Sequence, residues 1–171
     1  GRGSVNHGNM DAGSFIFELD QVRWIVDPGN QAYHALEKTG FNLWERCQNC
    51  ERWTLLTKNN YGHSTLTFNK ALHAVDGFAS ISDFKKGDQP AVTLDLSEVF
   101  GGTSGNVMRR FVKENDRSLL IEDTFDLSDT LRYITWQLMT TAEVEIVKAG
   151  AILKQDGKEL KLQQLSHPDL T

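Results

Sequence analysis

The feature that most constrains the fold of this 171-residue chain is the alternation of apolar and polar residues along most of its length. Alternation with period two runs through Ser14–Asp20 and Val22–Asp27, and Asp20-Gln21 between these runs predicts a hairpin turn. Successive side chains of a strand point to opposite faces, so this pattern allows one face to be buried. The chain is therefore expected to be a sheet protein.

The same pattern continues in short runs that are separated by turn residues. Further strands are expected at Arg52–Lys58, Ser64–Asn69, Leu72–Val75, Phe78–Phe84, Ala91–Leu96, Val107–Lys113, Ser118–Asp126, Leu131–Thr140, Glu143–Lys148, Ala151–Gln155 and Glu159–Leu165. Residues 30–46 are the best helical candidate, because large apolar residues recur there at spacings of three to five, with Gly40 as an interruption. We predict an all-β fold, an antiparallel sandwich of ten or more strands with one short helical insertion, forming a single domain over residues 1–171.

Charge and hydropathy narrow the range of partners. The formal net charge is −5, which argues against a nucleic-acid binder, because such proteins usually carry a basic stripe. The apolar runs stop far short of the roughly 20 residues that span a bilayer. We therefore expect neither nucleic acid nor membrane as a partner.

The two cysteines form the motif Cys47-Gln48-Asn49-Cys50. Such a pair can be a redox dithiol or half of a zinc site, but the chain has no second pair to complete the zinc site. We favour two thiols in a loop or short helix. A small local disulfide in an oxidising compartment is the alternative.

Polar residues at three expected strand ends predict one polar site. His7 and Asn9 lie in the Gly-rich opening segment, Asp27 ends the second run, and His63 precedes a later one. An imidazole, an amide oxygen and a carboxylate suit metal-assisted or imidazole-assisted chemistry on an acidic sugar. Each residue also has a simpler interpretation: a solvated His7, an Asp27 that caps the following turn, and a His63 at a strand edge.

The segments Asn6–Phe15 and Trp24–Gly29 resemble the heparinase II/III family of polysaccharide lyases. Arg52-Trp53 followed by Asn59–Leu66 is similar to a further segment of the family, with Ser64 where Asn is commoner, and Val75-Asp76-Gly77 fits the same pattern. The resemblance implies a β-sandwich that follows an N-terminal α/α toroid, so the chain is expected to be a fragment of a larger enzyme. It also implies a bacterial protein that is periplasmic or secreted.

The family's reaction is β-elimination on uronic-acid-containing polysaccharide, such as heparin or heparan sulfate. The resemblance implies that His7 is catalytic and that Asn9, Asp27 and His63 hold one structural divalent cation. Zinc or calcium is expected, and the identity stays open because Asn9 replaces the commoner histidine with a hard oxygen ligand. The tyrosine that completes the chemistry would come from the toroid, so the isolated domain is expected to be inactive or nearly so.

Two further residues are candidates for substrate binding. Arg52 could bind a sulfate or carboxylate, since guanidinium suits bidentate oxyanions, or it could pair with Glu51 or Asp27. Tyr61 could stack on a sugar ring or belong to the core. The competing function is a non-catalytic carbohydrate-binding or scaffolding sandwich. A metallohydrolase is disfavoured, because the ligand set is weak for a catalytic zinc ion.

Overall fold

Eleven strands in antiparallel pairs make up the part of the chain that this computed structural model describes, residues 2–5 and 7–166. The strands are β1 (Phe17–Leu19), β2 (Val22–Ile25), β3 (Leu66–Phe68), β4 (Ser80–Lys85), β5 (Ala91–Asp95), β6 (Val107–Lys113), β7 (Leu119–Phe125), β8 (Ile134–Trp136), β9 (Glu143–Val147), β10 (Gly150–Gln155) and β11 (Lys158–Gln163). One α-helix, α1 (Tyr33–Lys38), and three 3-10 helices, η1 (Glu51–Thr54), η2 (Asn60–Gly62) and η3 (Ser97–Phe100), accompany them in the described residues. The predicted fold class, an antiparallel β-sandwich with one short helical insertion, is confirmed.

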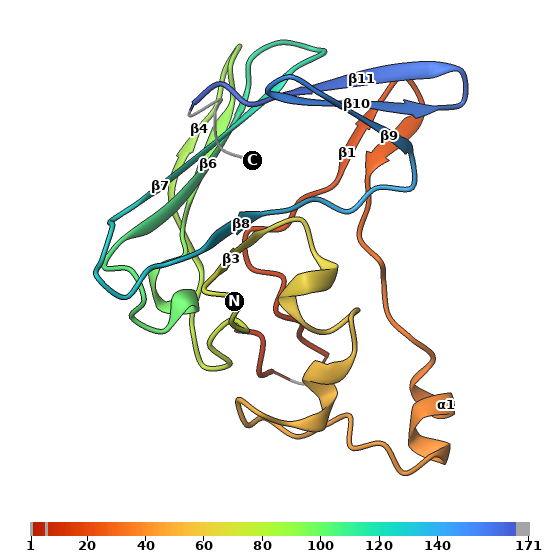
Figure 1. The fold of residues 1–171 in the computed structure, drawn as a ribbon, viewed down its shortest axis with the longest axis vertical. Coiled ribbons are helices and arrows are strands. Elements are labelled where there is room, and N and C mark those ends of the chain that lie inside the picture. The colour runs from red at the N-terminus through yellow and green to blue at the C-terminus, as the bar shows by residue number, and fades with distance from the viewer. Residues whose placement is uncertain (1, 6, 167–171) are drawn as a thin grey trace.

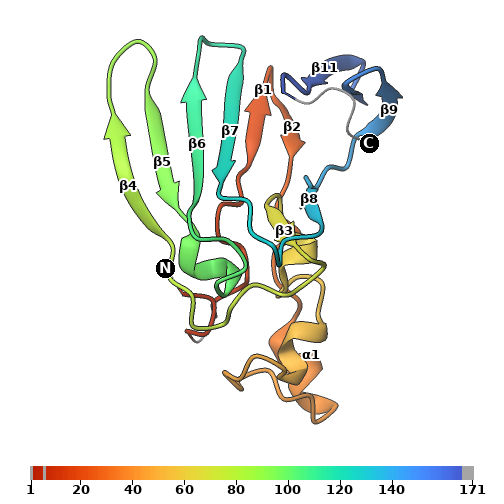
Figure 2. The same ribbon diagram turned by 60° about the vertical axis from the view of Figure 1, so that its left-hand side comes forward.

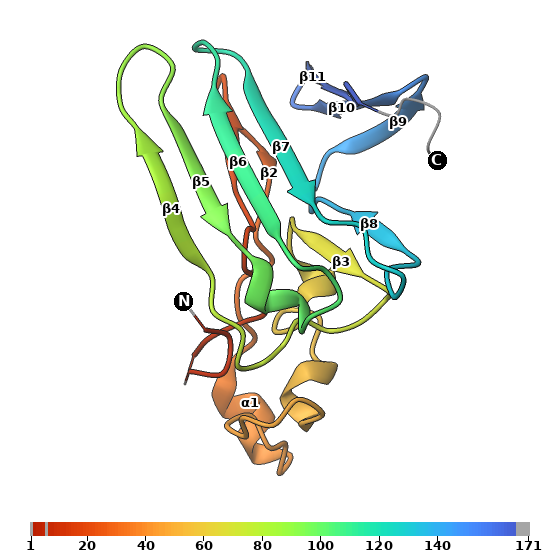
Figure 3. The ribbon, with the colours of Figure 1, turned by 90° about the vertical axis from the view of Figure 1, so that its left-hand side faces the viewer.

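The strands form a four-stranded sheet in the order β4-β5-β6-β7, a three-stranded sheet in the order β11-β10-β9, and the pairs β1-β2 and β3-β8. Figure 3 shows the four-stranded sheet along one side of the molecule and β9–β11 along the other. The β1-β2 hairpin lies between β7 and β9–β11 in Figure 2. The long connection from β2 to β3, which contains α1, η1 and η2, lies at one end of the sheets (Figure 1).

The predicted turn at Asp20-Gln21 is confirmed. Both residues have positive φ, 53° and 65°, and they join β1 to β2 with Leu19 opposite Val22. Positive φ at both central residues is the type I′ geometry, whose twist matches that of the paired strands. The turn therefore closes the hairpin whose strand β2 leads to Asp27.

The buried apolar side chains gather in three clusters. One joins β3, η3 and β6 through Leu66, Phe68, Leu96, Val99, Phe100 and Val107. A second joins β2 to β10 through Val22, Trp24, Ile25 and Leu153. The third, formed by Met10, Cys50, Trp53 and Val75, lies under the opening segment and the β2–β3 connection. This third cluster gives the N-terminal segment a fixed base, although it is not part of a strand.

The helix predicted over residues 30–46 is shorter than expected, because a C-terminal stop follows Lys38. Gly40 has φ +78°, its N–H donates to the carbonyl of Glu37 at 3.0 Å, and the N–H of Phe41 donates to Leu36 at 3.3 Å. This pair of bonds is the Schellman motif, in which a left-handed glycine ends a helix. The prediction treated Gly40 as an interruption, whereas it is the residue that ends α1.

Two predicted strands are wrong. Arg52–Lys58 contains the 3-10 helix η1 and turns, and Leu72–Val75 is irregular, ends in a turn and pairs with no strand among the described residues. In the second segment the N–H groups of His73 and Val75 donate to side-chain amide oxygens, of Asn60 at 3.1 Å and of Gln48 at 2.8 Å. Side chains thus replace the neighbouring strand that an alternating pattern would suggest.

Within residues 2–5 and 7–166, no helix combines the length and apolarity needed to cross a membrane.

Candidate functional site

The opening segment and the β2–β3 connection meet at the end of the sheets, and hydrogen bonds to backbone carbonyls and amides join them. Arg52 Nη2 donates to the carbonyl of Gly8 at 2.7 Å, and Met10 N–H donates to the carbonyl of Lys58 at 2.8 Å. Thr65 Oγ donates to the carbonyl of Ala12 at 2.6 Å. The segment that carries His7, Asn9 and Asp11 is therefore held along its length.

Arg109 of β6 fixes the end of this segment to the four-stranded sheet. Its fully buried guanidinium forms a bidentate pair with Asp123 of β7, at 2.7 and 2.8 Å, and also donates to the carbonyls of Gly13 and Ser64 at 2.8 and 3.2 Å. Gly13 has φ +76°, and a Cβ there would lie 2.9 Å from Leu96 Cδ1, so only glycine fits without strain. Because Arg109 donates to both Gly13 and Ser64, it holds the end of the opening segment next to the residue that follows His63.

Asp27 and His63 lie in direct contact, as the prediction of a shared polar site requires. His63 Nδ1 is 3.0 Å from Asp27 Oδ2, and Asp27 Oδ1 accepts the N–H of Gly29 at 2.8 Å. The imidazole is fully buried, while the Asp27 side chain keeps 34% of its exposure. The turn-capping role and the contact with His63 are both present, so the two interpretations of Asp27 are compatible.

Asn9 contacts a lysine instead of this pair. Its Oδ1 accepts a hydrogen bond from Lys58 Nζ at 2.9 Å, and Asn30 Oδ1 accepts another at 2.9 Å. The buried Nε2 of His63 has no hydrogen-bond partner within the described chain, and this fits a site that could take up a further group. Asp27 and His63 thus fit the predicted cation, but Asn9 does not in this arrangement, because an ion on its oxygen would stand next to the ammonium of Lys58. The three-residue metal site stays a prediction.

His7 is exposed and lies among aromatic side chains. Its ring stacks on Tyr33, with centroids 5.5 Å apart and planes inclined by 16°, and it meets the edge of Trp44 at 5.3 Å. His7 Nδ1 is also 3.4 Å from Tyr33 Oη. An exposed imidazole held by two rings can present its other nitrogen to a bound molecule. Its catalytic role is a prediction that the geometry does not test.

A cleft of about 220 Å³ opens beside these residues. His7, Asn9 and Asp11 of the opening segment line it, together with residues far along the chain that include His73 and Val99. Desolvation raises the pKa of Asp11, although part of the residue is exposed, and the electrostatic effect of His63 opposes this shift. The cleft can therefore bring a polar ligand next to an imidazole and a carboxyl group.

The two residues predicted to bind substrate differ in their exposure. Arg52 is fully buried, and its guanidinium donates to the carbonyls of Gly8 and Glu45. In this arrangement Arg52 supports the segment that carries His7. Tyr61 is 38% exposed and its hydroxyl donates to the carbonyl of Lys70 at 2.6 Å, which leaves a ring face at the surface. Binding of substrate by either residue stays a prediction.

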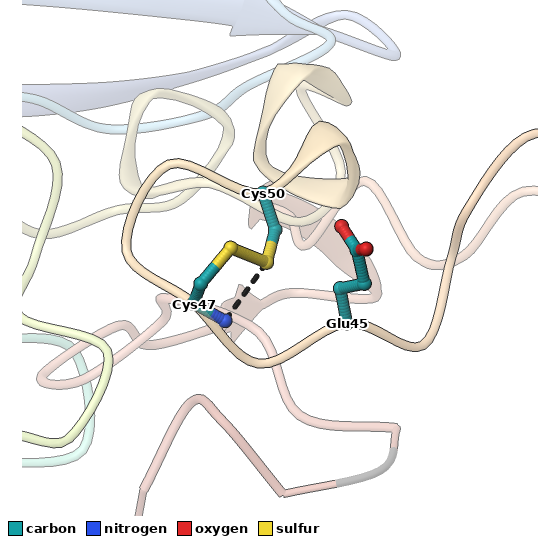
Figure 4. A group of neighbouring side chains, drawn as sticks. All are labelled: Glu45, Cys47 and Cys50. Carbon is teal, nitrogen blue, oxygen red and sulfur yellow. Dashed lines mark hydrogen bonds between the residues drawn. A yellow bond between two sulfur atoms is a disulfide. The ribbon is translucent and has the colours of Figure 1, made fainter.

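Cys47 and Cys50 form a disulfide, so the favoured interpretation of two free thiols is wrong and the alternative is confirmed. Figure 4 shows the bond, with the N–H of Cys47 directed at Cys50 Sγ and Glu45 beside the pair. These three residues are close enough to resemble a metal cluster. Sulfur atoms that are bonded to each other are not thiolate ligands, however, so the group does not indicate a cation.

The chain belongs to the heparinase II/III-like family. The family model described as "Heparinase II/III-like, C-terminal" matches residues 1–169, which is nearly the whole chain. The resemblance inferred from the sequence is thereby confirmed. A comparison with curated proteins gives no match.

The sequence did not indicate three residues of this site. Lys58 lies in a run that was predicted to be a strand, and Tyr33 and Trp44 were assigned to the apolar face of a helix. Lys58 is only 2% exposed, which is unusual for a lysine. No sequence signal indicated Lys58, because a lysine in an alternating run is ordinarily a solvated strand residue.

Proposed function

We propose that this chain is the β-sandwich part of a polysaccharide lyase that cleaves uronic-acid-containing polysaccharide by β-elimination. Membership of the heparinase II/III-like family carries this proposal. The exposed imidazole of His7 at the rim of a polar cleft supports it from the structure. The partners proposed with it are an acidic, glycosaminoglycan-like polysaccharide and an N-terminal toroid of the same protein.

β-Elimination requires a base for the C5 proton of the uronate, stabilisation of the developing enolate, and an acid for the leaving oxygen. In the proposed mechanism His7 acts at Nε2, as a base or as a cation next to the enolate, while Nδ1 contacts Tyr33. The main-chain contacts of Arg52 keep the segment in place during this step. The remaining acid or base would come from the toroid.

A divalent cation is proposed only as a structural element that Asp27 and His63 would hold. The cation takes no part in the proposed steps. Asn9, the third predicted ligand, accepts a hydrogen bond from Lys58. The disulfide between Cys47 and Cys50 supports a periplasmic or secreted location, since such bonds persist in oxidising compartments.

The test is replacement of His7 by alanine in the protein that carries both this chain and its toroid. Loss of one acid–base group should lower kcat by roughly 10²- to 10⁴-fold, measured by the ultraviolet absorbance of the unsaturated uronate product. His34→Ala is the matched control, because His34 is exposed on α1. A His7→Ala protein with full activity would leave the alternative, a carbohydrate-binding or scaffolding module, for which the exposed Trp44 and Tyr61 offer ring surfaces.

A further inference from the structure

Lys58 is a buried lysine whose ammonium is surrounded by uncharged acceptors. It lies 2.9 Å from Asn9 Oδ1, 2.9 Å from Asn30 Oδ1, 3.3 Å from Tyr33 Oη and 3.4 Å from the carbonyl oxygen of His7. Burying an ammonium costs free energy unless its donors are satisfied. Two side-chain amides, a phenol and a carbonyl satisfy these donors here, and they come from the opening segment and from the start of the β2–β3 connection.

The positions of these acceptors give Lys58 a specific relation to His7. One acceptor is the carbonyl of His7 itself, one is the side chain two residues later, and one is the hydroxyl of Tyr33, whose ring stacks on the imidazole. The ammonium also lies 5.2 Å from the centroid of the Tyr33 ring, within cation–π range. Both the backbone and the ring of His7 are therefore linked to one cation.

We propose that Lys58 is a positioning residue for His7, and that its ammonium occupies the Asn9 oxygen that the family pattern would assign to a divalent cation. This inference rests on the proposed catalytic role of His7. Lys58 is 2% exposed and does not line the cleft, so it acts through His7, Asn9 and Tyr33.

The hydrogen-bonding capacities of the groups agree with this role. A His7 that accepts a proton at Nε2 must carry its own proton at Nδ1 and donate it to Tyr33 Oη. The phenol oxygen has two lone pairs, so it can accept from His7 Nδ1 and from Lys58 Nζ together. Lys58 can only donate to Tyr33 Oη, and Tyr33 Oη is also the partner of His7 Nδ1, so the lysine and the phenol together set which ring nitrogen of His7 carries the proton.

The same contact has a consequence for cation binding. A divalent ion on Asn9 Oδ1 would stand next to the ammonium of Lys58, and like charges at such a distance repel. Asp27 and His63 contact each other without Asn9, so an ion held by these two residues remains compatible with the lysine. Asn9 should therefore make little contribution to any affinity for zinc or calcium.

The first experiment follows the His7 ring by ¹⁵N–¹H NMR in this chain, without any substrate. Lys58→Met and Tyr33→Phe should both shift the ring ¹⁵N signals of His7, which report its tautomer, away from their wild-type values, and Lys58→Arg should restore them in part. Lys113→Met is the control, because Lys113 is an exposed lysine at the far end of β6. Unchanged His7 signals in folded Lys58→Met or Tyr33→Phe would overturn the proposal. If Lys58→Met does not fold, Lys58→Gln, which keeps a donor but not the charge, takes its place in this test.

The second experiment titrates zinc and calcium into the wild-type chain and into Asn9→Ala by calorimetry. We expect the two proteins to have the same affinity for each ion, whether that affinity is measurable or zero. A loss of about tenfold or more in Asn9→Ala, the scale of a lost ligand interaction, would overturn the assignment of Asn9 to Lys58.

The third experiment uses the protein that includes the toroid. Lys58→Met should lower kcat by roughly 10- to 100-fold, the range found for groups that orient a functional histidine, with a much smaller change in KM. Recovery of kcat in Lys58→Arg supports the role, and an unchanged kcat in folded Lys58→Met contradicts it. Full activity of His7→Ala would remove the proposed function, whereas the NMR link between His7 and Lys58 would stand independently of that result.

Discussion

Replacing His73 by glutamine should make the stability of this protein less sensitive to acid. His73 is 2% exposed and its Nε2–H donates to the carbonyl of Leu66 at 2.8 Å. Burial lowers its pKa from 6.5 to about 4, and the electrostatic effects of His63 and Arg109 act in the same direction. The folded protein therefore keeps a neutral imidazole at a pH where the unfolded chain is already protonated.

The sign of the effect follows from this difference. Between pH 6.5 and about 4 the unfolded state binds more protons at His73 than the folded state does, so stability falls as the pH falls. With these two pKa values the histidine contributes a loss of about 2 kcal/mol at pH 5 and about 3 kcal/mol at pH 4, relative to neutral pH. Above pH 7 the contribution is close to zero.

The measurement is urea-induced unfolding of wild type and His73→Gln at a series of pH values from neutral to acid. Glutamine can donate to the Leu66 carbonyl but does not titrate, so the variant should lose this part of the pH dependence even if its stability at neutral pH is lower. His34→Gln, on the exposed surface of α1, should retain the wild-type slope. Equal slopes for wild type and His73→Gln would refute the assignment of acid sensitivity to this buried ring.

Two further predictions concern the supports of the site. Arg109→Met should lower the free energy of unfolding by roughly 3–5 kcal/mol, because it leaves the carboxylate of Asp123 buried without its partner. Chemical denaturation checks this value, and Arg110→Met, which breaks an exposed pair on the same strand, should cost less than about 1 kcal/mol; equal losses would contradict the role of burial. Replacing Cys47 and Cys50 together by serine should cost about 2 kcal/mol, the estimate for so short a loop, and a loss above about 5 kcal/mol would show that the bond does more than restrict the unfolded chain.

The strands could be predicted where turn residues mark their ends and where only one face of the sheet is buried. Asp20-Gln21 marks the β1-β2 hairpin, and Val107–Lys113 has the bounds of β6 as predicted. In both cases alternation along the strand matches a sheet with one buried face. Strand β10 follows the same rule through buried Ala151 and Leu153, and Asp156 and Gly157 have positive φ in its turn to β11. In β9 the alternation does not match burial, because Val144 and Ile146 are exposed.

The alternation of apolar and polar residues predicted strands wrongly where side chains, and not a neighbouring strand, bind the backbone. Arg52 and Trp53 are adjacent and both buried, which no strand with one solvated face allows. The burial of Arg52 depends on the carbonyl group of Gly8, which lies 44 residues earlier in the chain. Such contacts arise from tertiary structure, and a period of two in the sequence carries no information about them.

The site was predictable in part. The contact between Asp27 and His63 agrees with a shared polar site at strand ends. The engagement of Asn9 by Lys58 was not foreseen, because the motif specifies the side chains at the site but not the lysine that enters it from a neighbouring turn.

The β2–β3 connection surrounds His7, whereas the strands form the scaffold that carries it. The connection contains none of the eleven strands, yet it supplies Tyr33, Trp44 and Lys58 around His7. Its own fold is tied locally by the stop at Gly40 and by the disulfide after residue 46. An exchange of Trp44 would therefore alter the surroundings of the imidazole while leaving every strand untouched, and a ligand proposed to bind at His7 would meet a different ring surface there.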